Sequence, residues 1–171
     1  MAEALLRARL ADRAPGLAIG SVGQLYDGLP PERGAVKAMA DRGIDISHHE
    51  SRKQTPALIA DSSLILAMER LHVRDLSVLA PGTFERTFTL PEFVRLVEAE
   101  PPRADADLRR WVQRLGADRE HLGYLSSSAA DEVADPMGRS VRVFRACAAE
   151  LDDLISRMVD RVWPVSVPAA R

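Results

Sequence analysis

Cys147 is the only thiol in the 171 residues, so any chemistry that needs a thiol has one candidate. A single cysteine excludes an internal disulfide framework, and it excludes sites built from several thiolates, such as a zinc ribbon or an iron–sulfur cluster. Cys147 falls on the apolar stripe of a predicted helix, together with Ala148 and Leu151. We therefore expect a buried core cysteine rather than a reactive one.

Two other groups of polar residues could do chemistry. His48 and His49 stand together, with Asp45 and Glu50 nearby, which is a composition found in metal sites. Adjacent residues seldom bind one ion together, and no third, distant ligand group stands out, so we predict no metal and no other cofactor. Asp135 precedes Pro136, and by local sequence alone this pair indicates a turn.

The composition is that of an ordinary soluble globular protein, with 46% hydrophobic and 28% charged residues. The 23 Lys and Arg residues are nearly balanced by 25 Asp and Glu residues. A nucleic-acid partner normally requires a clustered excess of basic residues, so this balance argues against one. No apolar run approaches the roughly 18–20 residues of a membrane span. The first residues lack the basic-then-apolar order of a signal peptide. We expect one cytoplasmic domain without a membrane partner.

The elements that must position these residues alternate between strand and helix patterns. Helices are predicted over residues 2–14, 31–42, 55–60, 69–79, 91–99, 105–115 and 140–163, and strands over 17–22, 63–68 and 86–90. This alternation predicts an α/β fold with a mainly parallel sheet. Residues 1–163 form a single domain in this interpretation, and residues 164–171 form a C-terminal tail.

Residues 100–133 differ from the rest because they are polar and charged and contain Pro101-Pro102. We interpret this charged excursion as an insertion on one edge of the domain rather than as a second domain.

Several short motifs resemble one known family when they are taken in order. They are Met1-Ala2-Glu3-Ala4, Ile19–Gly23 with Gly28–Pro31, Gly43–His48, Ala60–Met68 and Asp135–Gly138. Each motif alone is weak, but their order resembles that of the low-molecular-weight protein tyrosine phosphatases. The resemblance covers roughly residues 2–162, apart from the charged excursion.

The resemblance implies a three-layer α/β sandwich with a mainly parallel sheet of about four strands. It also implies hydrolysis of phosphate monoesters, chiefly phosphotyrosine on proteins, through a phospho-cysteine intermediate and without a cofactor.

The resemblance assigns roles to four residues of this chain. Asp135 is the implied general acid, which protonates the leaving phenolate and later activates water. Ser21 and His48 match the side chains that hold the nucleophile loop in shape, although Ser21 could simply end a strand and His48 could be an ordinary turn residue. Tyr26 would form an aromatic wall of the substrate cleft, or it is a partly exposed loop aromatic. The family often has aromatic residues after its Asp-Pro pair, and this chain departs from that pattern with Met137.

The family's nucleophile loop, a Cys followed by five residues and an Arg, does not occur in these 171 residues. Cys147 is followed six positions later by Asp153. In the family this loop and the first strand stand directly before the Met-Ala-Glu-Ala helix, so we expect them before residue 1. The loop lowers the thiol pKa and its Arg binds the phosphoryl oxygens. We therefore expect the chain as given to be inactive, either because the sequence starts at an internal Met or because it is a degenerate family member.

Two other function classes stay open. One is a non-catalytic interaction protein on the phosphatase scaffold, for which the charged excursion would be the contact surface. The other is an arsenate reductase-like protein, which would need more cysteines for its redox relay than Cys147 alone. The substrate protein and the oligomeric state are not predicted by the sequence.

Overall fold

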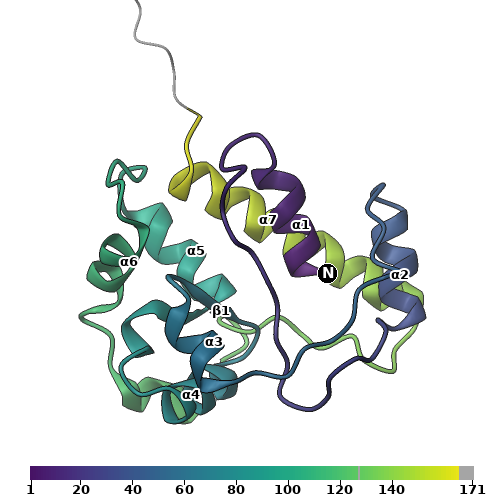
Figure 1. The fold of residues 1–171 in the computed structure, drawn as a ribbon, viewed down its shortest axis with the longest axis horizontal. Coiled ribbons are helices and arrows are strands. Elements are labelled where there is room, and N and C mark those ends of the chain that lie inside the picture. The colour runs from purple at the N-terminus through teal and green to yellow at the C-terminus, as the bar shows by residue number, and fades with distance from the viewer. Residues whose placement is uncertain (127, 166–171) are drawn as a thin grey trace, which may run out of the picture.

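The computed structural model describes residues 1–126 and 128–165 and has an α/β fold (Figure 1). The α-helices are α1 (Ala2–Leu10), α2 (Arg33–Ala40), α3 (Pro56–Asp61), α4 (Arg70–Leu79), α5 (Leu90–Ala99), α6 (Leu108–Gly116) and α7 (Val141–Val162). Two short 3-10 helices are η1 (Phe84–Arg86) and η2 (His121–Leu125), and the strands are β1 (Ile65–Ala67) and β2 (Thr87–Thr89). Each helix predicted from the sequence is present, with ends that differ by a few residues. The predicted tail lies outside the described residues from residue 166 onward.

The sheet is a parallel pair in which Ile65 lies opposite Thr87 and Ala67 lies opposite Thr89. The strand predicted over residues 17–22 is not confirmed, because that segment forms no ladder in the described structure. Only an isolated parallel bridge between Gly23 and Lys53 follows it. A strand exists only where a neighbour takes its backbone hydrogen bonds, and residues 17–22 have no such neighbour among the residues described. The layout of about four strands stays a prediction.

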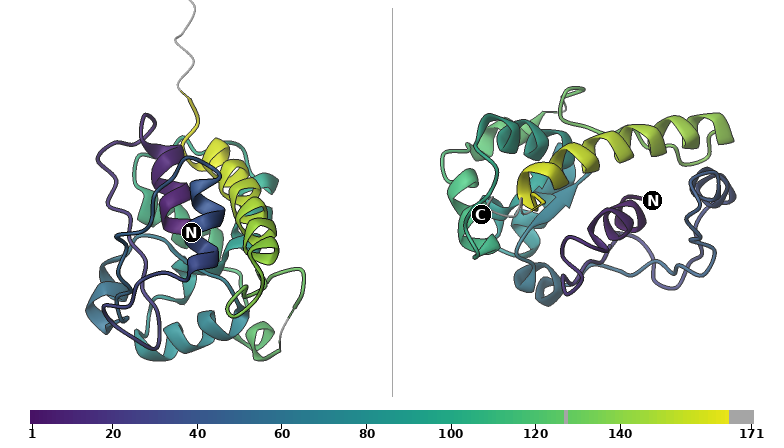
Figure 2. Two further views of the ribbon diagram at one scale, coloured as in Figure 1. Left: turned by 90° about the vertical axis from the view of Figure 1, so that its right-hand side faces the viewer. Right: turned by 90° about the horizontal axis from the view of Figure 1, so that it is seen from above.

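Helices cover the strand pair on both faces. Ile65 belongs to an apolar cluster with Ile59 of α3 and Leu76 of α4. Phe88 belongs to the main core, which also takes in buried residues of α1, α5 and α7. Figure 2 shows α1 and α7 running side by side, with α3 and α4 at a distance from them. The result is a layered arrangement with a small parallel sheet in the middle.

The long helix α7 forms the backbone of the main core. Its buried residues recur at a spacing of three or four, as its sequence predicts: Phe144, Cys147, Ala148, Leu151, Leu154, Ile155, Met158, Val159 and Val162. Helix α1 lies along it. Arg9 of α1 pairs with Asp152, and Arg13, just after the end of α1, pairs with Asp160, each at 2.7 Å. These exposed pairs orient α1, while the apolar contacts hold it in place.

The charged excursion of residues 100–133 is anchored to the sheet. The guanidinium of Arg119 donates to the carboxylate of Glu92 in α5 at 2.8 Å and to the Thr87 carbonyl of β2 at 2.8 Å. The same guanidinium lies 4.0 Å from the centre of the Phe88 ring. Glu92 also completes a capping box with Thr89 at the start of α5. The excursion is therefore packed against the domain as an edge of it.

Candidate functional site

Asp135 lies in the loop that leads into α7. The backbone N–H of Val133 donates to the carbonyl of Met68, just after β1, at 2.9 Å. This bond places the loop at the carboxyl end of the sheet, the end at which open α/β sheets bind ligands. The Asp135 side chain is exposed there.

The loop around Asp135 is a turn held by its own polar groups. The Asp135 carboxylate accepts the N–H of Met137 at 2.9 Å. Gly138 then takes a φ of 69°, a left-handed conformation that favours glycine. The N–H of Gly138 donates to the carboxylate of Glu32 at 3.3 Å, which ties the loop to the start of α2. The turn that the local sequence indicates is present, and it leaves the carboxylate at the surface.

Ser21 is connected to α1 through a carboxylate. Its hydroxyl donates to Glu3, and Glu3 also pairs with Arg7 one helical turn further on, at 2.9 Å. Burial favours the neutral form of Glu3, but the hydrogen bonds from Ser21 and Arg7 outweigh it and hold the pKa of this carboxyl below its ordinary value. Arg7 also donates to the carbonyl of Ile19. The sequence interpretation missed Glu3, because nothing local indicates that Ser21 would fold back onto this helix.

His48 and His49 occupy an exposed turn. The turn is closed by Asp45, whose carboxylate accepts the N–H of Ser47 at 2.8 Å. The hydrogen bonds of Ser47 lower the pKa of Asp45, and the nearby His48 adds to that effect. His49 is the histidine that lies near Glu3 and helps to lower the pKa of that carboxyl. The described residues give the His48 side chain no hydrogen bond, so its supporting role stays a prediction.

Tyr26 lies in a loop that is pinned to the segment around Ser51. The hydroxyl of Ser51 donates to the Tyr26 carbonyl at 2.9 Å and accepts the N–H of Leu29 at 3.0 Å. Gly28 allows the reversal of the chain with a φ of 70°. These bonds fix the backbone and leave the Tyr26 ring 62% exposed. Leu25, Leu29 and Met137 are also exposed.

Cys147 lies on the buried face of α7, as its position in the sequence predicts. Its exposed fraction is 7%. Burial raises the pKa of the thiol, and the negative charges of Glu150 and Asp135 raise it further. The carboxylate of Asp153, six positions later, pairs with Arg157 at 3.1 Å. The one thiol of the chain is therefore held in its neutral form.

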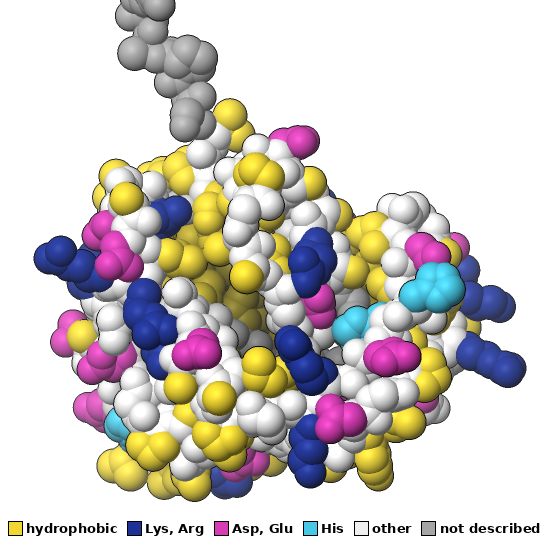
Figure 3. Space-filling model, viewed as in Figure 1, with side chains coloured by type: hydrophobic (Ala, Val, Ile, Leu, Met, Phe, Trp, Pro, Cys, Tyr) yellow, Lys and Arg dark blue, Asp and Glu magenta, His cyan; other side chains and the backbone are white. Residues whose placement is uncertain are grey.

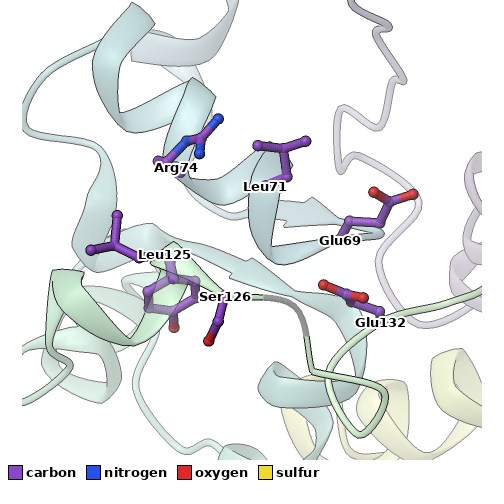
Figure 4. Close-up of a pocket in the computed structure, with 7 residues that line it drawn as sticks. Glu69, Leu71, Arg74, Leu125, Ser126 and Glu132 are labelled. Carbon is purple, nitrogen blue, oxygen red and sulfur yellow. The ribbon is translucent and has the colours of Figure 1, made fainter.

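A cavity of about 260 Å³ lies elsewhere, between α4 and the end of η2 (Figure 4). Its lining residues are Glu69, Leu71, Arg74, Tyr124, Leu125, Ser126 and Glu132. None of the four predicted site residues lines it. The carboxylates of Glu69 and Glu132 would repel a phosphate group, and Arg74, which also lines the cavity, is paired with Asp75 at 3.0 Å, so this cavity does not fit the predicted chemistry.

Two further structural facts bear on function. Within residues 1–126 and 128–165, no three His, Cys, Asp or Glu side chains come together in a way that could hold a metal ion. In the same part of the chain, no helix is both long enough and apolar enough to cross a membrane.

Comparison with known proteins identifies the family. The sequence profile described as "Low molecular weight phosphotyrosine protein phosphatase" matches residues 1–103 of this chain. The chain belongs to this family. The matched residues include α1, Ser21, Tyr26, His48 and the strand pair, while Asp135 lies beyond them.

Curated relatives of this chain are also named low molecular weight protein-tyrosine-phosphatases. The probable low molecular weight protein-tyrosine-phosphatase EpsP of Ralstonia nicotianae is 35% identical over 104 residues, which are 60% of this chain and 69% of the relative. The low molecular weight protein-tyrosine-phosphatase Etp of Escherichia coli K12 is 31% identical over 103 residues, 58% of this chain and 66% of the relative.

Solved structures share the fold over nearly the whole chain. The low molecular weight protein tyrosine phosphatase of T. tengcongensis has a TM-score of 0.69 and 24% identity, covering 94% of this chain and 88% of that one. Wzb of Vibrio vulnificus, solved with benzylphosphonate, has a TM-score of 0.66 and 19% identity with the same coverage. The YwlE arginine phosphatase of Geobacillus stearothermophilus has a TM-score of 0.67 and 24% identity, covering 93% and 80%. At these identities the likeness shows the fold alone.

Proposed function

We propose that this chain carries the scaffold and the general acid of a phosphate monoester hydrolase, and that its 171 residues alone do not turn substrate over. Membership of the phosphatase family supports the class of reaction. The exposed carboxylate of Asp135, at the carboxyl end of the sheet, supports the acid role. The prediction of inactivity rests on one observation: the thiol of Cys147 is buried and its pKa is raised.

Cys147 lacks each property that attack on phosphorus requires. The attacking species is a thiolate, but burial and neighbouring carboxylates raise the pKa of this thiol. Its place inside the core leaves no room for a phosphate ester. The residue six positions later is Asp153, whose negative charge would repel the phosphoryl oxygens that an Arg would bind. The chain therefore offers no thiol nucleophile for this reaction.

The reaction that the scaffold would support runs in two steps once a thiolate is supplied. The thiolate attacks phosphorus, the bond from phosphorus to the phenolic oxygen breaks, and Asp135 gives its proton to the leaving oxygen. The ionised Asp135 then takes a proton from water, whose oxygen attacks phosphorus and releases inorganic phosphate and the thiolate. Ser21, which donates to Glu3 of α1, would help to hold the nucleophile loop in shape, and the exposed ring of Tyr26 would flank the substrate. His48 would support the nucleophile loop from the exposed turn that it shares with Asp45.

Phosphotyrosine on a protein is the proposed substrate class, with small phosphate monoesters as model substrates. The relatives EpsP and Etp, both named as tyrosine phosphatases, support it. The YwlE structure of Geobacillus stearothermophilus is named for arginine phosphatase activity, and it shares the fold at 24% identity. Tyr26 and Met137 lie in two separate loops and are both exposed, so each side chain is free to contact the phenolic ring of such a substrate.

The test is hydrolysis of p-nitrophenyl phosphate by the purified chain, in the presence of a chelator and with or without vanadate. We expect no release of p-nitrophenol above the buffer rate, and the Cys147→Ser variant should behave identically. Metal-independent, vanadate-sensitive release by the chain would contradict the proposal.

A second candidate function is a non-catalytic interaction protein, because two leucines of the charged excursion are strongly exposed. Leu122 is 75% exposed and Leu125 is 66% exposed. Neighbouring apolar residues exposed in this way often mark a protein contact. A partner bound by the wild type should be lost in Leu122→Asp and Leu125→Asp and kept in Val78→Asp, which alters a 77% exposed residue of α4 outside the excursion. Equal loss in all three variants would reject this function.

A further inference from the structure

Basic side chains gather where α2 meets the start of α7. Residues 32–42 and 135–145 together hold six Lys or Arg and three Asp or Glu, whereas the whole chain has a net charge of -2. Figure 3 shows Lys and Arg side chains projecting from the edge of the molecule where Figure 1 places α2. A local positive charge therefore stands on a chain that is slightly negative overall.

Close packing brings these two segments together. A Cβ added to Gly34 of α2 would stand 2.3 Å from the ring of Phe144 in α7, so the two helices are in tight contact at this point. The Glu32 carboxylate accepts the N–H of Gly138 at 3.3 Å. The start of α2 is thus fixed beside the loop of Asp135 and beside the first turns of α7.

Four of the six cations are without a partner in the part of the chain that the structure describes. Of the other two, Arg145 pairs with Asp41 at 2.6 Å, and Arg42 donates to the Ala38 carbonyl at 3.2 Å. The four side chains that form no ion pair or hydrogen bond within residues 1–126 and 128–165 are all exposed: Arg33, Lys37, Arg139 and Arg142. Their charges are available to another molecule.

The stability of the helices does not explain where these cations stand. Arg33 is the first residue of α2 and Arg142 is the second residue of α7, and neither helix has an acidic residue in its first turn. Cations are unfavourable at such positions, because the helix macrodipole already places a positive partial charge at the N-terminus. The two helix starts therefore add to the positive potential of this surface.

We propose that this basic surface, defined by Arg33, Lys37, Arg139 and Arg142, binds an acidic segment of the substrate protein beside its phosphorylated residue. The identity of this partner rests on the proposed function, because the surface adjoins the loop that carries Asp135. Three of the four cations are Arg, whose guanidinium can bond to a carboxylate through two parallel hydrogen bonds.

The mixture of charges selects a peptide rather than a nucleic acid. Glu32 and Asp135 lie within the same two segments, and their carboxylates would repel an unbroken row of phosphates. A peptide can space its carboxylates to meet the cations and avoid these two groups. The side chain of Met137, which is 63% exposed, offers an apolar contact between them.

The probe is an unphosphorylated, fluorescein-labelled peptide in which Glu and Asp alternate with Gly and Ser on both sides of one Tyr. Binding is followed by fluorescence anisotropy at about 20 mM salt. We expect saturable binding that is lost at about 500 mM salt, where the Debye length falls to about 4 Å. A peptide with Lys at each acidic position should not bind. Absence of saturable binding of the acidic peptide, or equal or tighter binding of a single-stranded DNA of the same charge, would overturn the proposal.

Charge-reversed variants place the site. Arg139→Glu combined with Arg142→Glu should weaken binding of the acidic peptide at least about tenfold. The matched control is Arg110→Glu, which reverses an exposed cation of α6 outside the basic surface and should change binding less than about twofold. Fluorescence of the buried Trp111 and Trp163 checks that each variant is folded, and Arg139→Gln decides if the double variant is not. An equal loss of binding in Arg110→Glu would contradict the placement.

A photo-reactive p-benzoylphenylalanine in place of the Tyr of the peptide tests whether the bound segment lies beside the general-acid loop. We expect cross-links to residues 133–138, and cross-links confined to other parts of the chain would overturn the proposal. These measurements follow binding and need no turnover. Their failure would therefore leave the result with p-nitrophenyl phosphate, and the proposed function, unaffected.

Discussion

Replacing Arg119 with Met should destabilise the protein strongly, because the guanidinium bonds to four partners that are buried or largely buried. It bonds to Glu92 at 2.8 Å, to the hydroxyl of Tyr124 at 2.9 Å, and to the carbonyls of Phe84 and Thr87 at 3.0 and 2.8 Å. The exposed fractions of the Arg119 and Glu92 side chains are 9% and 13%. Methionine fills a similar volume but leaves the Glu92 carboxylate without its cation.

Removal of one partner from a buried ion pair costs about 3–5 kcal/mol. For a domain of this size each kcal/mol lowers the melting temperature by about 2–4 °C, so we expect a fall of about 10 °C. Urea unfolding followed by tryptophan fluorescence measures the change in the free energy of unfolding. The matched control is Arg114→Met, since Arg114 is 59% exposed and its pair with Glu100 should contribute less than about 1 kcal/mol. A loss below about 1 kcal/mol for Arg119→Met would refute the conclusion that this cluster anchors the charged excursion.

Three other predictions test separate parts of the structure. Gly116→Ala would place a Cβ 2.0 Å from the carbonyl oxygen of Glu85, so it should cost about 1–3 kcal/mol in urea unfolding, while Gly123→Ala, with open space around it, should not. Cys147 should react slowly with a thiol reagent at about pH 8 in the native protein and rapidly in urea, because burial raises its pKa; equal rates would contradict its core position. Burial and a carboxylate partner raise the pKa of Tyr124, so the folded state keeps this proton while the unfolded chain loses it. Stability should therefore fall as the pH rises above about 10, and Tyr124→Phe should flatten that fall in a pH series of urea titrations; an unchanged slope would show that another group is responsible.

The helices could be predicted well because their signals are local. The apolar spacing of α7 predicts a helix over residues 140–163, within one residue of its observed ends, and Pro91 with Glu92 predicts the start of α5. Local signals could not decide whether residues 17–22 form a strand. Strand formation depends on a partner elsewhere in the chain, and the apolar pattern of Leu17 and Ile19 fits both a paired strand and an unpaired edge of the core.

The candidate site was predictable only in its parts. The turn at Asp135 follows from Asp-Pro and from the glycine at position 138, and both are visible in the sequence. The bond from Ser21 to Glu3 joins residues 18 positions apart, and no local pattern indicates it. The Arg119 cluster joins side chains of α5 and η2 and a backbone carbonyl of β2, so it too depends on the tertiary fold.

The most direct measurement of the central claim is phosphate release from p-nitrophenyl phosphate by the 171-residue chain beside its Cys147→Ser variant. The buried, neutral thiol predicts that both proteins stay at the buffer rate at every pH at which they are folded. Vanadate-sensitive release by the wild type that disappears in Cys147→Ser would show that this thiol is a nucleophile, and it would contradict the account.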